Sequence, residues 1–376
     1  MIKKYKISVP KSTLNNIYKK VRNYPWNNIQ KMDGWLHGTN HDYLKKISKY
    51  WTSKFNWKLQ EKKINKFNNF TTNIEGIKIH FIREKGSGKN PTPLLILHGW
   101  PGSIVEFLEV IEKLAHPEKF GGNIEDSFDV IVPSLPGFGF SGAPKKPMGP
   151  RKISKIMNEL MTKKLKYKKY IAQGGDWGAT ISKWIAELYP ENCIGLHLNL
   201  VPAFPPSNGN VTDDLSEEEI KGLENFEKYQ KTGLGYYQIQ MTKPQSLGYA
   251  LNDSPVGLAG WIVEKFHSWT NDDLDRIVIN DDEVLAIVSL YWFTQSITSS
   301  MRLYYENGII SFSPNYIETP TGGIIFDKEI VRPPKAWAKK IYNIVHWTNA
   351  EGGHFAAMEN PETLANDIVS FTKEII

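Results

Sequence analysis

A repeated order of buried strand, glycine-containing loop and helix constrains this chain more than any other feature. Apolar runs at 93–97, 128–132 and 170–173 each end in such a loop, and a further strand is expected near 195–200. Period-two alternation over 70–82 predicts a β-hairpin ahead of them. Buried strands that alternate with helices form parallel sheets covered on both faces. The order therefore predicts an α/β protein with a mainly parallel sheet.

The segments on either side of this repeat predict two additions to the sheet. Residues 201–320 replace the alternation with loops and helices, which predicts a cap (lid) inserted over the carboxyl edge of the sheet. A short strand at 322–326 then resumes the core. Residues 1–72 are polar and helical with spaced aromatic residues, which predicts a segment that wraps the rest of the chain. The core is therefore expected in two parts, 73–200 and 321–376.

Composition excludes several classes of protein. Of the 376 residues, 40% are hydrophobic and 23% are charged, which is typical of a globular chain. The longest nearly unbroken apolar run, Val284–Phe293, has ten residues including one serine, about half of what a membrane-spanning helix requires. The N-terminus does not resemble a signal peptide. Cys193 is the single cysteine, and no Cys/His cluster has zinc-ligand spacing. We therefore expect a cytoplasmic protein without a transmembrane segment or a metal site.

The net charge of +6 comes largely from lysine and is uneven along the chain. Base readout in nucleic acids favours arginine, so no nucleic-acid partner is predicted. Residues 145–169 hold ten basic residues against one acid, with apolar residues at helical spacing. This pattern indicates a helix with a solvated lysine face, and peripheral contact with an anionic membrane surface is the alternative.

The stretch Gly174–Gly178 is the most informative for chemistry. It lies between a buried strand and a helix, and its glycines permit the tight turn of a nucleophile elbow, which lifts the central side chain into the site. The central residue is Asp176. A carboxylate there can displace a leaving group at a saturated carbon and leave an alkyl ester on the enzyme. The alternative is that Asp176 only caps the following helix.

Hydrolysis of an alkyl ester needs a base, and His354 is the best candidate for it. This histidine lies in a glycine loop near the C-terminus, where the last member of a nucleophile–acid–base triad is expected in chain order. The carboxylate that orients it is expected just after the strand at 322–326. Asp327 and Glu329 both stand there, and sequence spacing alone does not separate them.

An oxyanion hole needs two backbone N–H groups aimed at one point. Trp177, directly after Asp176, is expected to supply one of them. Trp100, in the loop after the first buried strand, is expected to supply the other. Without that role, the Trp100 loop is only a tight turn that enters a helix.

Three motifs together resemble the microsomal-type epoxide hydrolases of the α/β-hydrolase superfamily: His98–Ser103 (HGWPGS), Gly174–Gly178 (GGDWG) and Gly352–Ala357 (GGHFAA). The resemblance covers nearly the whole chain. Trp57–Glu61 and Phe70–Thr72 are similar to the N-terminal wrapping domain of that family, and 250–258 is similar to its cap. The resemblance implies an α/β-hydrolase core with a helical cap insertion and an N-terminal helical wrapping segment.

The resemblance also implies roles for single residues. Asp176 would be the nucleophile, His354 the general base and Glu329 the acid, and the family often carries proline where this chain has Asp327. Two cap tyrosines of the family hold the epoxide oxygen. The matching residues here are Tyr236 and Tyr304, each followed by another tyrosine.

The implied reaction converts a small-molecule epoxide to a vicinal diol through a covalent ester on Asp176, without a cofactor. Phenols suit it because they can hydrogen-bond to the ring oxygen and then protonate the developing alkoxide. Six aromatic residues of the cap predict an apolar pocket and hence a lipophilic substrate: Trp261, Phe266, Trp269, Tyr291, Trp292 and Phe293.

Two other functions stay open. A haloalkane dehalogenase would share the aspartate nucleophile but needs N–H donors for a halide, of which Trp177 offers one. A catalytically silent hydrolase fold that binds a lipophilic partner is the second alternative. A longer, membrane-anchored form also stays open, because relatives are often tethered to the endoplasmic reticulum by an N-terminal helix. A homodimer stays open as well.

Overall fold

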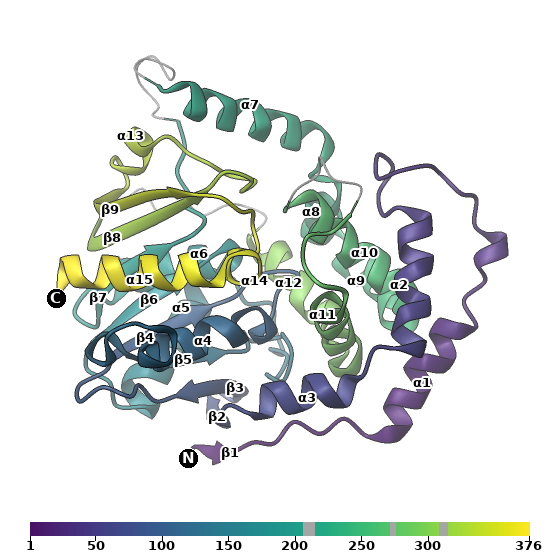
Figure 1. Ribbon diagram of the computed structural model, residues 1–376, viewed down its shortest axis with the longest axis horizontal. Helices are drawn as coiled ribbons and strands as arrows, with labels where there is room; N and C mark the ends of the chain where they lie inside the picture. The colour runs from purple at the N-terminus through teal and green to yellow at the C-terminus, as the bar shows by residue number, and fades with distance from the viewer. Residues whose placement is uncertain (206–214, 271–275, 308–314) are drawn as a thin grey trace.

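The computed structural model describes residues 1–205, 215–270, 276–307 and 315–376, and within these ranges nine strands form one sheet (Figure 1). Their order in the sheet is β1-β2-β3-β5-β4-β6-β7-β8-β9. The strands are β1 (Lys3–Lys4), β2 (Asn69–Ile74), β3 (Ile77–Glu84), β4 (Thr92–Leu97), β5 (Phe128–Pro133), β6 (Tyr170–Gly174), β7 (Cys193–Leu198), β8 (Ile317–Phe326) and β9 (Tyr342–Ala350). All pairs from β5 to β9 along this order are parallel, which confirms the predicted α/β fold.

The hairpin predicted over 70–82 is formed by β2 and β3, with Ile74 paired to Ile77. Glu75 and Gly76 have φ values of 50° and 80°, the left-handed backbone that a two-residue hairpin turn requires. β3 then pairs antiparallel with β5, so the hairpin extends the parallel part of the sheet at one edge.

Helices cover both faces of the sheet (Figure 1). α4 (Leu108–Ala115) and α15 (Pro361–Ile375) contact each other on one face, and α5 (Pro150–Glu159) and α6 (Asp176–Leu188) contact each other on the other. The covered strands carry apolar runs, and β5 and β6 are buried at every residue. Two short helices, α13 (Lys335–Ala338) and α14 (Ala356–Glu359), flank β9 in the chain.

The chain between β7 and β8 forms a helical layer beside the sheet, as Figure 1 shows. α12 contacts α8 and α9, and α10 contacts α11. The helices of this layer are α7 (Glu217–Thr232), α8 (Gly235–Thr242), α9 (Pro244–Asp253), α10 (Pro255–Ser268), α11 (Asp281–Thr294) and α12 (Ile297–Asn307). The predicted helical cap insertion is thereby confirmed.

The N-terminal helices pack on this cap (Figure 1). α1 (Lys11–Arg22) and α2 (His41–Ser53) contact α10, and α3 (Trp57–Asn65) contacts α11. Tyr43 and Tyr50 donate hydrogen bonds to Asp281 and Asp282 in the first turn of α11, each at 2.9 Å. Because β1 also pairs with β2, this wrapping segment ties the cap to the edge of the sheet.

The C-terminal part of the core contains more strand than the sequence pattern indicated. β8 begins at Ile317, before the strand expected at 322–326, and β9 was absent from the prediction. β9 is an edge strand in which Tyr342 and His346 are the buried residues. Because its polar and apolar residues do not alternate regularly, the sequence pattern does not predict this strand.

The lysine-rich segment forms α5 and a following π-helical turn, Leu160–Lys164. Ile153, Ile156 and Met157 are buried on its inner face, whereas Lys152 and Lys155 are exposed. A solvated lysine face accounts for this pattern. In the ranges that the structure describes, no helix combines the length and the apolar character that a membrane span requires.

Asp367 on α15 binds two strands of the core. One carboxylate oxygen hydrogen-bonds His197 Nε2 on β7 at 2.9 Å, and the other hydrogen-bonds His346 Nε2 on β9 at 3.0 Å. Thr348 Oγ1 also donates to it at 2.6 Å. Burial alone would raise the pKa of this carboxyl, but its hydrogen bonds and the histidine charge lower the pKa to about 2.

Asp367→Asn is expected to lower the free energy of unfolding by about 3 kcal/mol near neutral pH, because a buried charged acceptor is lost. Since the folded pKa lies below the ordinary value of 3.8, this stability is present above about pH 4 and is lost as pH falls toward 2. Urea unfolding of both proteins at neutral and acid pH measures the difference. As a control, Asp126→Asn removes an exposed pair with Lys373 and should cost under about 1 kcal/mol. Equal costs for the two variants would contradict the account.

Candidate active site

Asp176 stands at the tight turn between β6 and α6, with a φ of 49°. The glycines on either side are required by close contacts. A Cβ atom at Gly174 would lie 2.3 Å from the backbone of Gly178, and one at Gly178 would lie 2.0 Å from the carbonyl oxygen of Leu97 on β4. The turn therefore has the geometry of the predicted elbow, with the carboxylate raised at the carboxyl edge of the sheet.

The loop after β4 contacts the same carboxylate. The Trp100 N–H donates to Asp176 Oδ1 at 2.7 Å, and a Cβ atom at Gly99 would lie 1.9 Å from that oxygen. Trp177 follows Asp176 in the first turn of α6. An N–H that already binds a carboxylate oxygen is well placed to bind the charge that develops there when the carboxyl carbon becomes tetrahedral.

His354 bridges two carboxylates. Its Nε2 lies 3.5 Å from Asp176 Oδ2, and its Nδ1 hydrogen-bonds Glu329 Oε1 at 2.8 Å. Asp327 instead accepts a hydrogen bond from the Gly352 N–H at 2.9 Å. Of the two acidic candidates after β8, Glu329 is thus the one in contact with the imidazole.

The protonation of His354 depends on these neighbours. Burial by itself lowers the pKa of the imidazole, but the charge of Glu329 and the hydrogen bond and charge of Asp176 act against it. The effects of the two carboxylates outweigh that of burial, and the pKa of His354 is raised well above the ordinary value of 6.5. The resting site therefore favours a protonated imidazole between two carboxylates.

Two residues that the sequence analysis did not single out for the triad hold the His354 loop. Glu359 on α14 accepts hydrogen bonds from the N–H groups of Gly353 at 2.9 Å and Phe355 at 3.0 Å. The His354 N–H donates at 2.8 Å to the carbonyl oxygen of Trp269, whose ring also meets the imidazole edge-on at 4.9 Å. No sequence motif signals these contacts, because they depend on how the loop folds against the cap.

Two cap tyrosines lie beside the elbow. Tyr236 on α8 and Tyr304 on α12 are buried, with ring centroids 6.0 Å apart. Tyr236 stacks on Trp100 at 5.4 Å, and Tyr304 meets Trp177 edge-on at 4.8 Å. Burial raises the pKa of both phenols well above 10, and the charge of Asp176 adds to the shift. The cap thus brings two protonated phenols close to the nucleophile.

A small cavity of about 20 Å³ adjoins Asp176 and His354. Its volume is sufficient for about one water molecule. Glu106 and Asn199 also line it, and burial raises the pKa of Glu106 to about 8, against the opposing effect of the Ser103 N–H. Ser103 and Glu106 form the capping box that begins the helix after β4, so the sequence signal for Glu106 indicated only a helix start.

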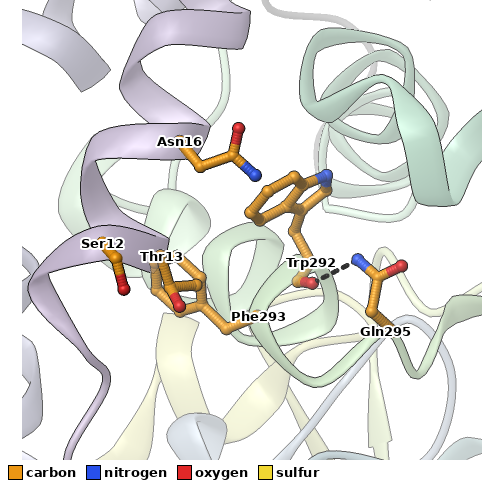
Figure 2. Close-up of a pocket in the computed structure, with 6 residues that line it drawn as sticks. All are labelled: Ser12, Thr13, Asn16, Trp292, Phe293 and Gln295. Carbon is orange, nitrogen blue, oxygen red and sulfur yellow. Dashed lines mark hydrogen bonds between the residues drawn. The ribbon is translucent and has the colours of Figure 1, made fainter.

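The six cap aromatics predicted to line one pocket separate into different places. Trp269 lies against His354, and Tyr291 donates to the Gly102 carbonyl at 2.9 Å. Figure 2 shows that Trp292 and Phe293 instead line a surface depression of about 350 Å³ next to α1. The prediction was wrong for these two residues, because the wrapping segment, and not the substrate site, covers that end of α11.

Within the described ranges, no group of three or more His, Cys, Asp and Glu side chains is arranged to hold a metal ion. Cys193 is a free, buried cysteine on β7, and burial raises the pKa of its thiol to about 12.

Comparison with known proteins places this arrangement in a family. The family described as epoxide hydrolase N terminus matches residues 2–107, and the alpha/beta hydrolase fold matches 92–230. The chain is 40% identical over 368 residues to a putative epoxide hydrolase of Stigmatella aurantiaca (strain DW4/3-1), a match that covers 97% of this chain and 83% of that protein. It is 37% identical over 401 residues to epoxide hydrolase 1 of Sus scrofa, with 98% and 88% covered. The structure of Aspergillus niger epoxide hydrolase matches with a TM-score of 0.91 at 31% identity, with 100% and 97% covered.

An elbow aspartate, a histidine and a second acid at the carboxyl edge of a parallel sheet define the class of α/β-hydrolases. The matches within that class extend over nearly the whole chain. The chain belongs to the epoxide hydrolase family and is an enzyme of that kind, which confirms the resemblance carried by its three motifs.

Proposed function

We propose that the protein converts a lipophilic epoxide to a vicinal diol through a covalent ester on Asp176. The observation that supports this most is the pair of buried phenols, Tyr236 and Tyr304, beside the elbow. The rings of Trp100 and Trp269 are buried with them, so the epoxide is expected to enter an aromatic, apolar site.

The proposed division of the chain follows the same chemistry. The cap, 201–320, carries both phenols, whereas the core parts, 73–200 and 321–376, carry the nucleophile and the base. The segment 1–72 supports the cap through α1 to α3. The reaction is thus proposed to occur where cap and core meet.

In the first step, Asp176 attacks an epoxide carbon, the carbon–oxygen bond breaks, and its electron pair stays on the ring oxygen. Tyr236 and Tyr304 hydrogen-bond to that oxygen, and one of them transfers its proton. The products are a hydroxyalkyl ester and a phenolate. The phenols matter because an unprotonated ring oxygen is a poor leaving group.

In the second step, a water beside His354 loses a proton to the imidazole and adds to the ester carbonyl carbon. The N–H groups of Trp100 and Trp177 bind the oxyanion. Before water attacks, ester formation has removed the Asp176 charge that raises the pKa of His354, so the imidazolium of the resting site gives its proton to the phenolate and becomes the neutral base. The tetrahedral intermediate then collapses to the diol, which takes its proton from the Asp176 carboxyl. His354 keeps the proton that it took from water, which restores the resting site.

A haloalkane dehalogenase is the second candidate, and one observation favours it. The indole N–H groups of Trp100 and Trp177 are buried and have no hydrogen-bond partner among the described residues. Two indole donors could bind a halide. The phenols distinguish the candidates, because a halide leaves without a proton whereas an alkoxide requires one.

The test is to incubate the protein separately with an aryl epoxide, a haloalkane and an aryl ester, and to measure diol, halide and acid. Diol from the epoxide alone supports the proposal. Halide release without diol would identify a dehalogenase. If no product forms and no covalent adduct is found, the silent binding fold becomes the better account.

Tyr236→Phe and Tyr304→Phe are each expected to slow ester formation by about 10²-fold, because one donor to the ring oxygen is lost. Single-turnover mixing with an aryl epoxide, followed by tryptophan fluorescence, measures this step. Tyr305→Phe is the matched control, since Tyr305 is 53% exposed and should react at close to the wild-type rate. Ester formation at the wild-type rate in both phenylalanine variants would contradict the role of the phenols.

A further inference from the structure

Lys265 on α10 is buried although lysine is rarely found away from solvent. The residue is 4% exposed, and its ammonium pairs with Glu264. Burial lowers the pKa of this ammonium, and the charge of Glu264 acts against that effect. Burial of a cation costs free energy, so the groups that contact Lys265 must offset that cost.

One of two aromatic rings beside this ammonium belongs to a proposed catalytic residue. Lys265 Nζ lies 4.3 Å from the ring centroid of Tyr236 and 5.7 Å from that of Trp269. Tyr236 is also stacked on Trp100, so its ring is fixed by a tryptophan and a cation together. A cation within about 6 Å of a ring centroid is attracted to the face of the ring.

The two proposed catalytic phenols differ in their surroundings. The Tyr229 hydroxyl on α7 donates a hydrogen bond to the Tyr236 oxygen at 3.3 Å. This bond occupies a lone pair and leaves the Tyr236 proton available. No hydrogen bond of standard geometry joins the buried Tyr304 hydroxyl to the described part of the chain, and the Trp177 and Tyr236 side chains beside it only partly offset the rise in its pKa that burial causes. Only Tyr236 thus has both a donor on its oxygen and a cation near its ring.

We propose that Lys265 and Tyr229 stabilise the phenolate of Tyr236, so that Tyr236 transfers the proton to the epoxide oxygen while Tyr304 only donates a hydrogen bond. This inference rests on the proposed function. In the transfer, the Tyr236 O–H bond breaks, the proton joins the developing alkoxide, and the electron pair remains on the phenol oxygen. Negative charge then spreads into the ring that faces the ammonium, so the attraction is stronger after transfer than before it, and the barrier falls.

Lys265→Met tests the role of the charge, because methionine keeps an unbranched apolar chain without the ammonium. Ester formation from an aryl epoxide is expected to slow about tenfold, whereas hydrolysis of the ester by His354 should change less than about twofold. Lys265→Arg should restore most of the rate, because it restores the cation. Tyr229→Phe should slow the same step about fivefold.

Lys183 provides the matched control. It is 5% exposed on α6, and its Nζ lies 5.5 Å from the ring centroid of Tyr342. Tyr342 pairs with Ile317 at the start of β8, at the opposite end of that strand from Phe326 and the triad acid. Lys183→Met therefore makes the same chemical change in a similar environment away from the site, and it should leave ester formation at the wild-type rate.

A change of substrate separates charge stabilisation from simple packing. An epoxide with a trifluoromethyl group on the carbon that keeps the oxygen forms a less basic alkoxide, which needs proton transfer less. The loss caused by Lys265→Met should shrink with this substrate. An equal loss for both substrates, equal slowing of both steps, or no recovery with arginine would overturn the inference.

The outcomes also separate this inference from the proposed function. If the wild type forms no diol from any epoxide, the proposed function fails and the inference fails with it. If the wild type forms diol and Lys265→Met forms the ester at the wild-type rate, only the inference fails.

Discussion

Replacing Asp176 with asparagine is expected to lower diol formation by about four orders of magnitude, because the amide cannot attack the epoxide carbon as the carboxylate does. Asparagine is the suitable replacement, since Asp176 has a φ of 49° and asparagine tolerates this left-handed conformation. The folded elbow should therefore persist. Steady-state diol formation measures the loss, and thermal unfolding verifies that the variant is folded.

Asp327→Asn serves as the control for this variant. Asp327 lies near the triad in the chain, but its carboxylate accepts from the Gly352 N–H, which an asparagine oxygen can also do. Diol formation should stay within about threefold of the wild type. If Asp176→Asn retained a comparable rate, the assignment of Asp176 as the nucleophile would be wrong.

His354→Gln is expected to form the ester but hydrolyse it about 10³-fold more slowly, because no base remains to activate water. The ester should accumulate on the protein after one turnover. Intact-protein mass spectrometry should then show a mass gain equal to the whole epoxide, since both the ring carbons and the ring oxygen remain attached. Glutamine is polar and similar in length, which limits the disturbance of the loop.

Two further proteins complete this experiment. The double variant Asp176→Asn/His354→Gln should show no mass gain, which locates the adduct on the elbow. His116→Gln, at a histidine near Ser87 and outside the site, should turn over like the wild type and retain no adduct. Normal turnover by His354→Gln would contradict its role as the base.

Much of the fold was predictable because strong local patterns coincide with the packing. The runs at 93–97, 128–132 and 170–173 are apolar except for Asp129 and Gln173, as is typical of strands buried on both faces. The glycines of the elbow are demanded by contacts with β4 and with the backbone of the turn itself. Such close contacts require glycine at fixed positions, so the elbow could be predicted from the amino-acid sequence.

Other features left little or no trace. β9 lies at the sheet edge with mixed polarity, and its hydrogen-bonding to β8 depends on a register that no local pattern encodes. The aromatic residues at the end of α11 predicted an apolar substrate pocket, which was wrong for Trp292 and Phe293, because a local pattern does not tell which surface these side chains face. Which surface covers a helix face is decided by the tertiary fold.

The site shows the same division. The elbow and the glycine loops predicted Asp176 and His354 as candidate catalytic residues. Sequence spacing did not decide which of the two acids after β8 orients the histidine. The hydrogen bond at 2.8 Å shows that Glu329 contacts the imidazole. The cation near Tyr236 arises because α8 and α10 lie together, although 29 positions separate Tyr236 from Lys265. Contacts between distant segments of this kind require the structure.

The measurement that tests the central proposal most directly is a single turnover in water enriched in oxygen-18, with the enzyme in excess over an aryl epoxide. If the ester on Asp176 forms, the oxygen added to the diol comes from the carboxylate, so the diol of this first turnover carries no label and the label enters Asp176. Later turnovers should then release labelled diol. A diol that is fully labelled in the first turnover, with unlabelled Asp176, would show direct attack by water and would contradict the covalent mechanism.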